Sequence, residues 1–67
     1  MNEGDKLYRV HVNDKYWGTR YGKSAEDVMR QVNEWIGYSE AADKTILVHL
    51  DMDSYPKGTP VEKVEKA

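Results

Sequence analysis

The sequence predicts one small α+β domain in which a β-hairpin is followed by a helix and a third strand. Residues 6–13 and 45–52 alternate between apolar and polar side chains, whereas residues 25–36 carry an apolar stripe with helical spacing. At 67 residues the chain has room for one domain with a modest core. We expect residues 1–53 to form this β-β-α-β domain and residues 54–67 to form a C-terminal tail or a short docked helix.

The first two strands are expected at residues 6–13 and 16–21. Between them, Asn13-Asp14-Lys15 supplies turn-forming residues. A two-residue loop at either Asn13-Asp14 or Asp14-Lys15 places the same side chains of the two strands on one face. A three-residue loop would change which side chains share a face. With the two-residue loop, one face of the hairpin holds Tyr8, Val10, Val12, Trp17, Thr19 and Tyr21. The opposite face then holds Arg9, His11, Tyr16 and Arg20.

A helix is expected at residues 25–36. Ser24 is typical of an N-cap, and Glu26 and Asp27 lie in the first turn, where the helix dipole favours acids. Gly37 suits the position after the last helical residue. At about 100° per residue, the apolar side chains fall within an arc of about 120°. They are Ala25, Val28, Met29, Val32, Trp35 and Ile36.

The third strand is expected at residues 45–52, after a connection at residues 38–44. Its buried face consists of Ile46, Val48, Leu50 and Met52. The helix returns the chain so that the third strand is antiparallel to the first. A three-stranded antiparallel sheet in the order 2-1-3 keeps every neighbour antiparallel and the crossover right-handed, whereas the order 1-2-3 needs a parallel pair. Trp17 and Trp35 are then expected to meet in the core between the hairpin and the helix.

The C-terminal segment carries a helix-start signal. Residues 59–62 read Thr-Pro-Val-Glu, the pattern of a capping box with proline at the first helical position. We therefore expect a short helix at residues 61–66 that docks on the domain or frays.

Composition excludes several classes of protein. The chain has no cysteine, which excludes disulfides and zinc–thiolate sites and fits a reducing cytoplasm. Its longest apolar run, residues 46–48, is far shorter than the ~20 residues of a membrane span. The first residues lack the basic start and apolar stretch of a signal peptide. We therefore expect a cytoplasmic protein with no membrane association.

Three patterns resemble ligand sites but depart from them. Gly22-Lys23-Ser24 before a helix lacks the earlier glycine of a phosphate-binding loop, because position 17 is Trp. Asp51-Met52-Asp53 is not followed by the oxygen ligand and glycine that an EF-hand loop requires. His11 and His49 with Asp51 would be a minimal transition-metal ligand set, but polar residues on an exposed sheet face are the simpler interpretation. We expect no catalytic residue, no metal and no cofactor.

The face of the sheet that the single helix leaves uncovered is the candidate binding surface. Its predicted binding residues are Arg9, His11, Tyr16, Arg20, Leu47 and His49. Arginine, tyrosine and an aliphatic anchor are typical of protein–protein contacts, and basic residues with an aromatic also bind nucleic acid. The net charge of −2 favours a protein partner. We expect a small non-enzymatic protein-interaction module, an adaptor or inhibitor of a larger protein or a homodimer. The alternative is a nucleic-acid-binding module that uses the same face.

The order of elements, with the helix start Lys-Ser-Ala-Glu-Asp-Val at residues 23–28 after a hairpin, resembles that of many small accessory open reading frames of phages and plasmids. The resemblance covers residues 6–53 and is one of organisation. It implies an accessory protein of a phage or mobile element and carries over no functional residue.

Overall fold

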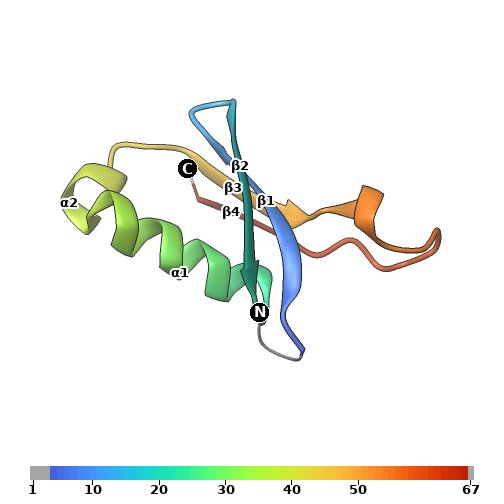
Figure 1. Cartoon of the computed structure of the whole chain (residues 1–67). Helices are drawn as coiled ribbons and strands as arrows, with labels where there is room; N and C mark the ends of the chain where they lie inside the picture. Colours follow the sequence, from blue (N-terminus) through green and yellow to red (C-terminus); the bar gives the residue numbers. More distant parts are fainter. Residues whose placement is uncertain (1–3, 67) are drawn as a thin grey trace.

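The computed structural model describes residues 4–66 as a four-stranded sheet with one main helix on one face (Figure 1). The elements are β1 (Lys6–Val12), β2 (Lys15–Gly22), α1 (Ala25–Ile36), α2 (Tyr38–Ala41), β3 (Ile46–Leu50), the 3-10 helix η1 (Met52–Ser54) and β4 (Lys63–Lys66). The strand order is β2-β1-β3-β4, and every neighbouring pair is antiparallel. The α+β class and the 2-1-3 order are confirmed, and β4 adds a fourth strand to the three predicted.

β1 and β2 are joined by a two-residue turn at Asn13 and Asp14. Their φ angles are 51° and 66°, which a type I′ turn requires and which Asn and Asp tolerate. The Asn13 backbone N–H donates to the Thr45 carbonyl at 2.8 Å, and the Asn13 side-chain oxygen accepts from the Thr45 N–H at 3.0 Å. The turn therefore ties the hairpin to the start of β3.

A β-bulge interrupts the pairing of β1 with β2. His11 pairs with Tyr16, but Val10 pairs with Gly18, so Trp17 is an extra residue with no partner on β1. Gly18 has a φ of 139°, a conformation that side chains of L-residues rarely allow. The bulge moves every later residue of β2 by one position relative to β1.

Beyond the bulge, the two faces of β2 are exchanged relative to the prediction. Arg20 opposes the buried Tyr8 and therefore lies on the α1 side, whereas Tyr21 opposes Leu7 on the other face. A shift of one residue has this effect because side chains alternate with a period of two. The predicted facing is wrong for Thr19, Arg20 and Tyr21.

α1 begins and ends as predicted. The Ser24 hydroxyl accepts from the Asp27 N–H at 3.1 Å, and the Gly37 N–H donates to the Asn33 carbonyl at 2.9 Å. The buried residues of α1 are Ala25, Val28, Met29 and Val32. Trp35 is instead 65% exposed, so its predicted place in the core is wrong.

The core lies between α1 and the facing sides of β1 and β3. Its buried apolar residues are Tyr8, Val10, Val12, Ala25, Val28, Met29, Val32, Ala41, Ile46, Val48 and Leu50. Ala41 comes from α2, a short helix within the connection predicted at residues 38–44. Met52, predicted to end the third strand, lies in η1 and is only partly buried.

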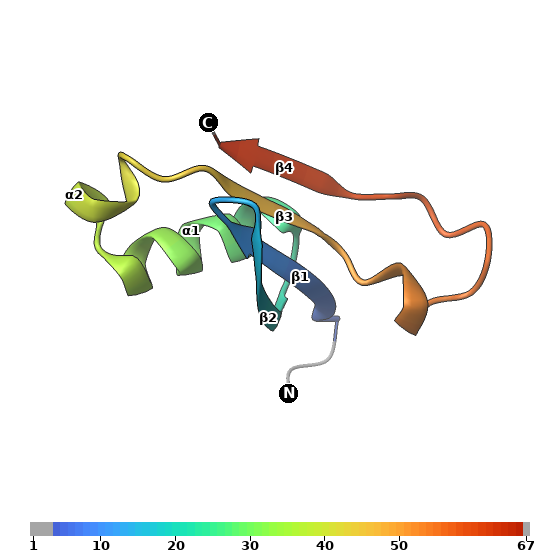
Figure 2. The ribbon, with the colours of Figure 1, turned by 90° about the horizontal axis from the view of Figure 1, so that it is seen from above.

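The C-terminal segment forms a strand where a helix is predicted. Figure 2 shows β4 running along β3 on the side away from β1. Val64 opposes the buried Val48, so the one apolar residue of β4 points toward the core. Glu62, the acid of the predicted capping box, instead caps α1, because its Oε1 accepts from the Ala25 N–H at 2.7 Å. Pairing with β3 therefore outweighs the local helix signal.

The contact between Glu62 and Ala25 predicts a pH-dependent stability. The Ala25 N–H lowers the pKa of the Glu62 carboxyl. A lowered folded-state pKa stabilises the fold above the unfolded value of about 4.3, and the stabilisation is lost as the pH falls through the lower folded value. Urea unfolding should show Glu62→Gln less stable than wild type at neutral pH, with the gap narrowing toward about pH 3. A gap of constant size would contradict this contact.

The matched control for this experiment is Glu65→Gln, which removes an exposed carboxylate from β4, three residues after Glu62. The free energy of unfolding of this variant should stay within about 0.5 kcal/mol of wild type at neutral pH.

Candidate functional site

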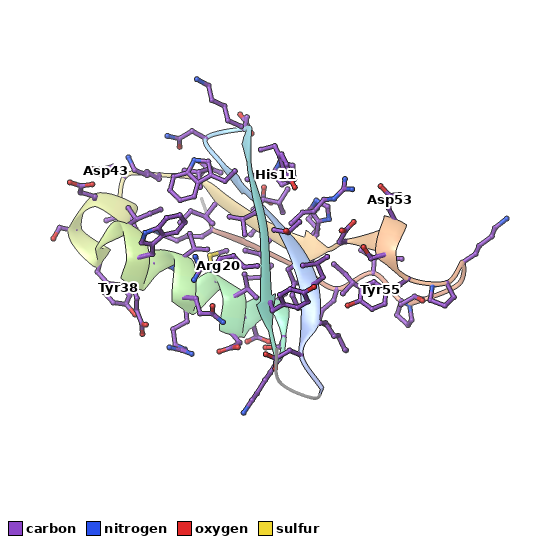
Figure 3. The ribbon with its side chains drawn as sticks, viewed as in Figure 1. His11, Arg20, Tyr38, Asp43, Asp53 and Tyr55 are labelled. Atoms are coloured by element: carbon purple, nitrogen blue, oxygen red, sulfur yellow. The ribbon has the colours of Figure 1, made fainter. Side chains whose placement is uncertain are left out.

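Five of the six predicted binding residues share the open face of the sheet. They are Arg9 and His11 on β1, Tyr16 on β2, and Leu47 and His49 on β3. The sixth, Arg20, lies between β2 and α1. Figure 3 shows Arg20 on the helix side of β2 and His11 on the other side. The structure therefore divides the predicted site between two surfaces.

Arg9 is held by two aspartates at the end of β3. Its Nε lies 3.0 Å from Oδ1 of Asp51, and its Nη2 lies 2.8 Å from Oδ2 of Asp53. Asp51 is 6% exposed, and its other oxygen accepts from the Ser54 hydroxyl at 2.9 Å. The Arg9 Nε–H does not point at Oδ1, so the contact with Asp51 is an ion pair without a well-formed hydrogen bond. Asp51, then Asp53, raises the pKa of Arg9 and keeps it charged.

The positions of the two arginines weaken the nucleic-acid alternative. Arg9 forms ion pairs with two carboxylates, and Arg20 is on the opposite side of the sheet. A phosphate-binding face needs free cations arranged together. The open face thus lacks the pair of arginines on which that alternative depends.

His11 and His49 meet at the centre of the open face. Their Nε2 atoms lie 3.0 Å apart, and the Tyr16 ring lies 5.5 Å from the His11 ring, measured between centroids. Asp51, the predicted third ligand of a metal set, is engaged by Arg9 and Ser54 instead. Within residues 4–66, no group of three or more His, Cys, Asp or Glu side chains gathers to hold a metal.

A second surface, which we name the β2–α1 patch, consists of Trp17, Arg20 and Trp35. The two indole rings meet edge to face with centroids 5.3 Å apart. The Arg20 guanidinium lies 5.0 Å from the centroid of the Trp35 ring, within the range of a cation–π contact. Trp35 is 65% exposed and Trp17 is 46% exposed. A hollow of about 130 Å³ opens between the three side chains, with Val10, Gly18 and Thr19 in its walls.

The sequence contains one signal for this patch. An isolated glycine within a strand pattern indicates a bulge, and Gly18 follows Trp17 in the second strand. A bulge at that point would have placed Arg20 on the helix side. The contact between Trp17 and Trp35 is predicted correctly, but both rings are exposed at the edge of the domain instead of buried in its core.

The two edges of the sheet differ in how they are protected. β4 is a short edge with four residues, and Lys63 and Glu65 alternate with its apolar residue. β2 is an edge of eight residues that pairs with β1 alone and carries the exposed rings of Tyr16, Trp17 and Tyr21. Charges and short length discourage the addition of another strand, so β2 is the more accessible edge.

Comparison with known protein families, with curated proteins and with solved structures finds no match for this chain. Function is therefore inferred from the geometry of the chain itself. No helix within residues 4–66 is long and apolar enough to cross a membrane.

The ion pair of Arg9 with Asp51 predicts a structural role for Arg9. Arg9→Ala should lower the free energy of unfolding by more than the control variant Thr19→Ala does, because it leaves the buried Asp51 carboxylate without its cation. Adding Asp51→Asn to Arg9→Ala should recover part of the loss, since no buried unpaired charge then remains and Asp53 is exposed to water.

Thr19→Ala is the matched control in denaturant unfolding, because the exposed Thr19 opposes Arg9 on β2. Its effect should stay within about 0.5 kcal/mol. Equal losses for the Thr19 and Arg9 variants would show that Asp51 does not depend on Arg9.

Proposed function

We propose that this chain is a small non-enzymatic protein-interaction module that acts as an adaptor or inhibitor of a larger protein. The β2–α1 patch is its principal contact surface. The observation that carries the proposal is the pair of exposed tryptophans held together beside an arginine and a hollow.

Burial of the patch by a partner would be strongly favourable. Removing apolar surface from water contributes about 25 cal/mol per Å², and a tryptophan exposes a large apolar ring. Tryptophan and arginine are also the residue types most enriched among the few positions that dominate protein–protein binding energy. Trp17 and Trp35 are of this residue type, and both rings are exposed to solvent.

The patch is preorganised for binding. Trp17 restricts the Trp35 ring on one side, and Arg20 restricts it on another. Side chains that are already ordered lose less conformational entropy when a partner arrives. The hollow between them accommodates an apolar side chain of the partner, and the adjacent edge of β2 offers backbone groups for an added strand.

The wider setting of the proposal comes from the sequence. The absence of cysteine supports a cytoplasmic module, and the order of elements supports an accessory role in a phage or mobile element. The cytoplasmic location and the accessory role are therefore parts of the function that we propose.

The patch predicts that Trp35→Ala disrupts partner binding without unfolding the domain. Immobilised wild-type chain should capture its partner from a lysate of the source organism, and the purified pair should then be measured by titration calorimetry. Trp35→Ala should weaken the affinity at least about 30-fold, the loss expected for a dominant contact residue. Its melting temperature should stay near that of wild type, because the ring is mostly exposed.

Val61→Ala is the matched control, since Val61 is an exposed apolar residue outside the patch. Sedimentation of the wild-type chain alone distinguishes a second copy from a different protein as the partner. If Trp17→Ala, Trp35→Ala and Val61→Ala all bind the captured protein as wild type does, the patch is not the contact surface.

A further inference from the structure

The ring nitrogens of His11 and His49 face each other on the open face of the sheet. The residues lie on neighbouring strands, where His11 opposes Leu47 and His49 opposes Arg9, so the imidazoles meet diagonally across β1 and β3. Their centroids are 5.1 Å apart and their Nε2 atoms are 3.0 Å apart, so the two nitrogens face each other. Both side chains are half-buried on the open face.

A backbone carbonyl orients His49. Its Nδ1 lies 3.0 Å from the Leu50 oxygen, and a carbonyl oxygen can only accept, so Nδ1 carries the hydrogen. With its hydrogen on Nδ1, His49 has a lone pair on Nε2, and we assign the Nε2–H of His11 as the donor to it. Histidines that bind metals are commonly held in this way, with the other ring nitrogen donating to a carbonyl.

The separation of the two nitrogens matches that of neighbouring ligands on one metal ion. Two imidazole nitrogens bound to zinc at about 2.05 Å lie about 3.3 Å apart at a tetrahedral angle. At a right angle, as in square-planar or octahedral sites, they lie about 2.9 Å apart. The observed 3.0 Å falls between these values, so rotation of the rings would bring both lone pairs onto one ion with little movement of the strands.

We propose that His11 and His49 together bind a transition-metal ion of the imidazole-preferring class, Zn²⁺, Ni²⁺ or Cu²⁺. His11 changes tautomer on binding, so that its Nε2 also presents a lone pair. Two protein ligands leave the remaining positions to water or to a donor from another molecule. Hard ions such as Mg²⁺ prefer oxygen ligands and are not bound here.

Two cations flank the pair and differ in their effect on a bound metal ion. Lys63 opposes His49 across β3 and β4, so its positive charge works against a bound cation. Arg9 opposes His49 on the other side, but Asp51 and Asp53 offset its charge. Lys63 is therefore the residue whose removal should strengthen metal binding.

The test is calorimetric titration of untagged, full-length chain with Zn²⁺, Ni²⁺ and Mg²⁺. Wild type should bind one Zn²⁺ or Ni²⁺ per chain and show no heat with Mg²⁺. His11→Gln and His49→Gln should each weaken binding at least about tenfold, and Lys63→Gln should strengthen it. Imidazole ¹⁵N spectra should show the Nε2 signals of both histidines shifting in the same titration.

Two results would overturn the proposal. One is the absence of saturable binding by wild type at millimolar Zn²⁺ or Ni²⁺. The other is equal binding by wild type and by a His11→Gln/His49→Gln double variant that melts near the wild-type temperature. Because the site is on the opposite face from the β2–α1 patch, either result leaves the proposed protein-binding role intact.

Discussion

The β-bulge at Trp17 determines which side chains this domain presents on each surface. Side chains alternate along a strand, so one extra residue exchanges the faces of everything that follows it. Without the bulge, Arg20 would lie on the open face. With it, Arg20 lies over the Trp35 ring, and the unpaired Trp17 reaches the same ring. The β2–α1 patch exists because of this single insertion in the pairing.

The sheet separates two kinds of chemistry. On the α1 side, the exposed aromatic rings of the patch continue outward from the apolar core. On the other side, polar and ionic contacts dominate: Arg9 with its two aspartates, and the pair of histidines. The polar side chains at the centre of the open face are therefore engaged in internal contacts, whereas the two tryptophan rings of the patch remain exposed.

β4 completes the sheet and gives β3 two neighbours. β3 has apolar residues on both faces, as expected for a strand with two neighbours. Ile46 and Val48 are buried on the α1 side, and Leu47 points to the open face. The segment that leads into β4 also caps the N-terminus of α1 through Glu62. In a chain with a small core, one C-terminal segment thus contributes both sheet pairing and helix capping.

Much of the fold follows from local patterns in the sequence. The hairpin turn, both ends of α1 and the order of the first three strands are predictable because each depends on neighbouring residues or on a simple connection. β4 is not predictable in this way, since four residues with one apolar side chain suit a helix or a strand equally and the pairing with β3 decides. The candidate site depends on the register of β2, so five of its predicted residues share a face and Arg20 does not.

The positions of Trp17 and Arg20 depend on the register of the hairpin, and cross-strand nuclear Overhauser contacts measure this register directly. The bulge predicts backbone contacts from Tyr8 to Arg20 and from Leu7 to Tyr21. A regular hairpin on the same turn would instead pair Tyr8 with Thr19 and Leu7 with Arg20, and contacts of that pattern would show that the bulge is absent.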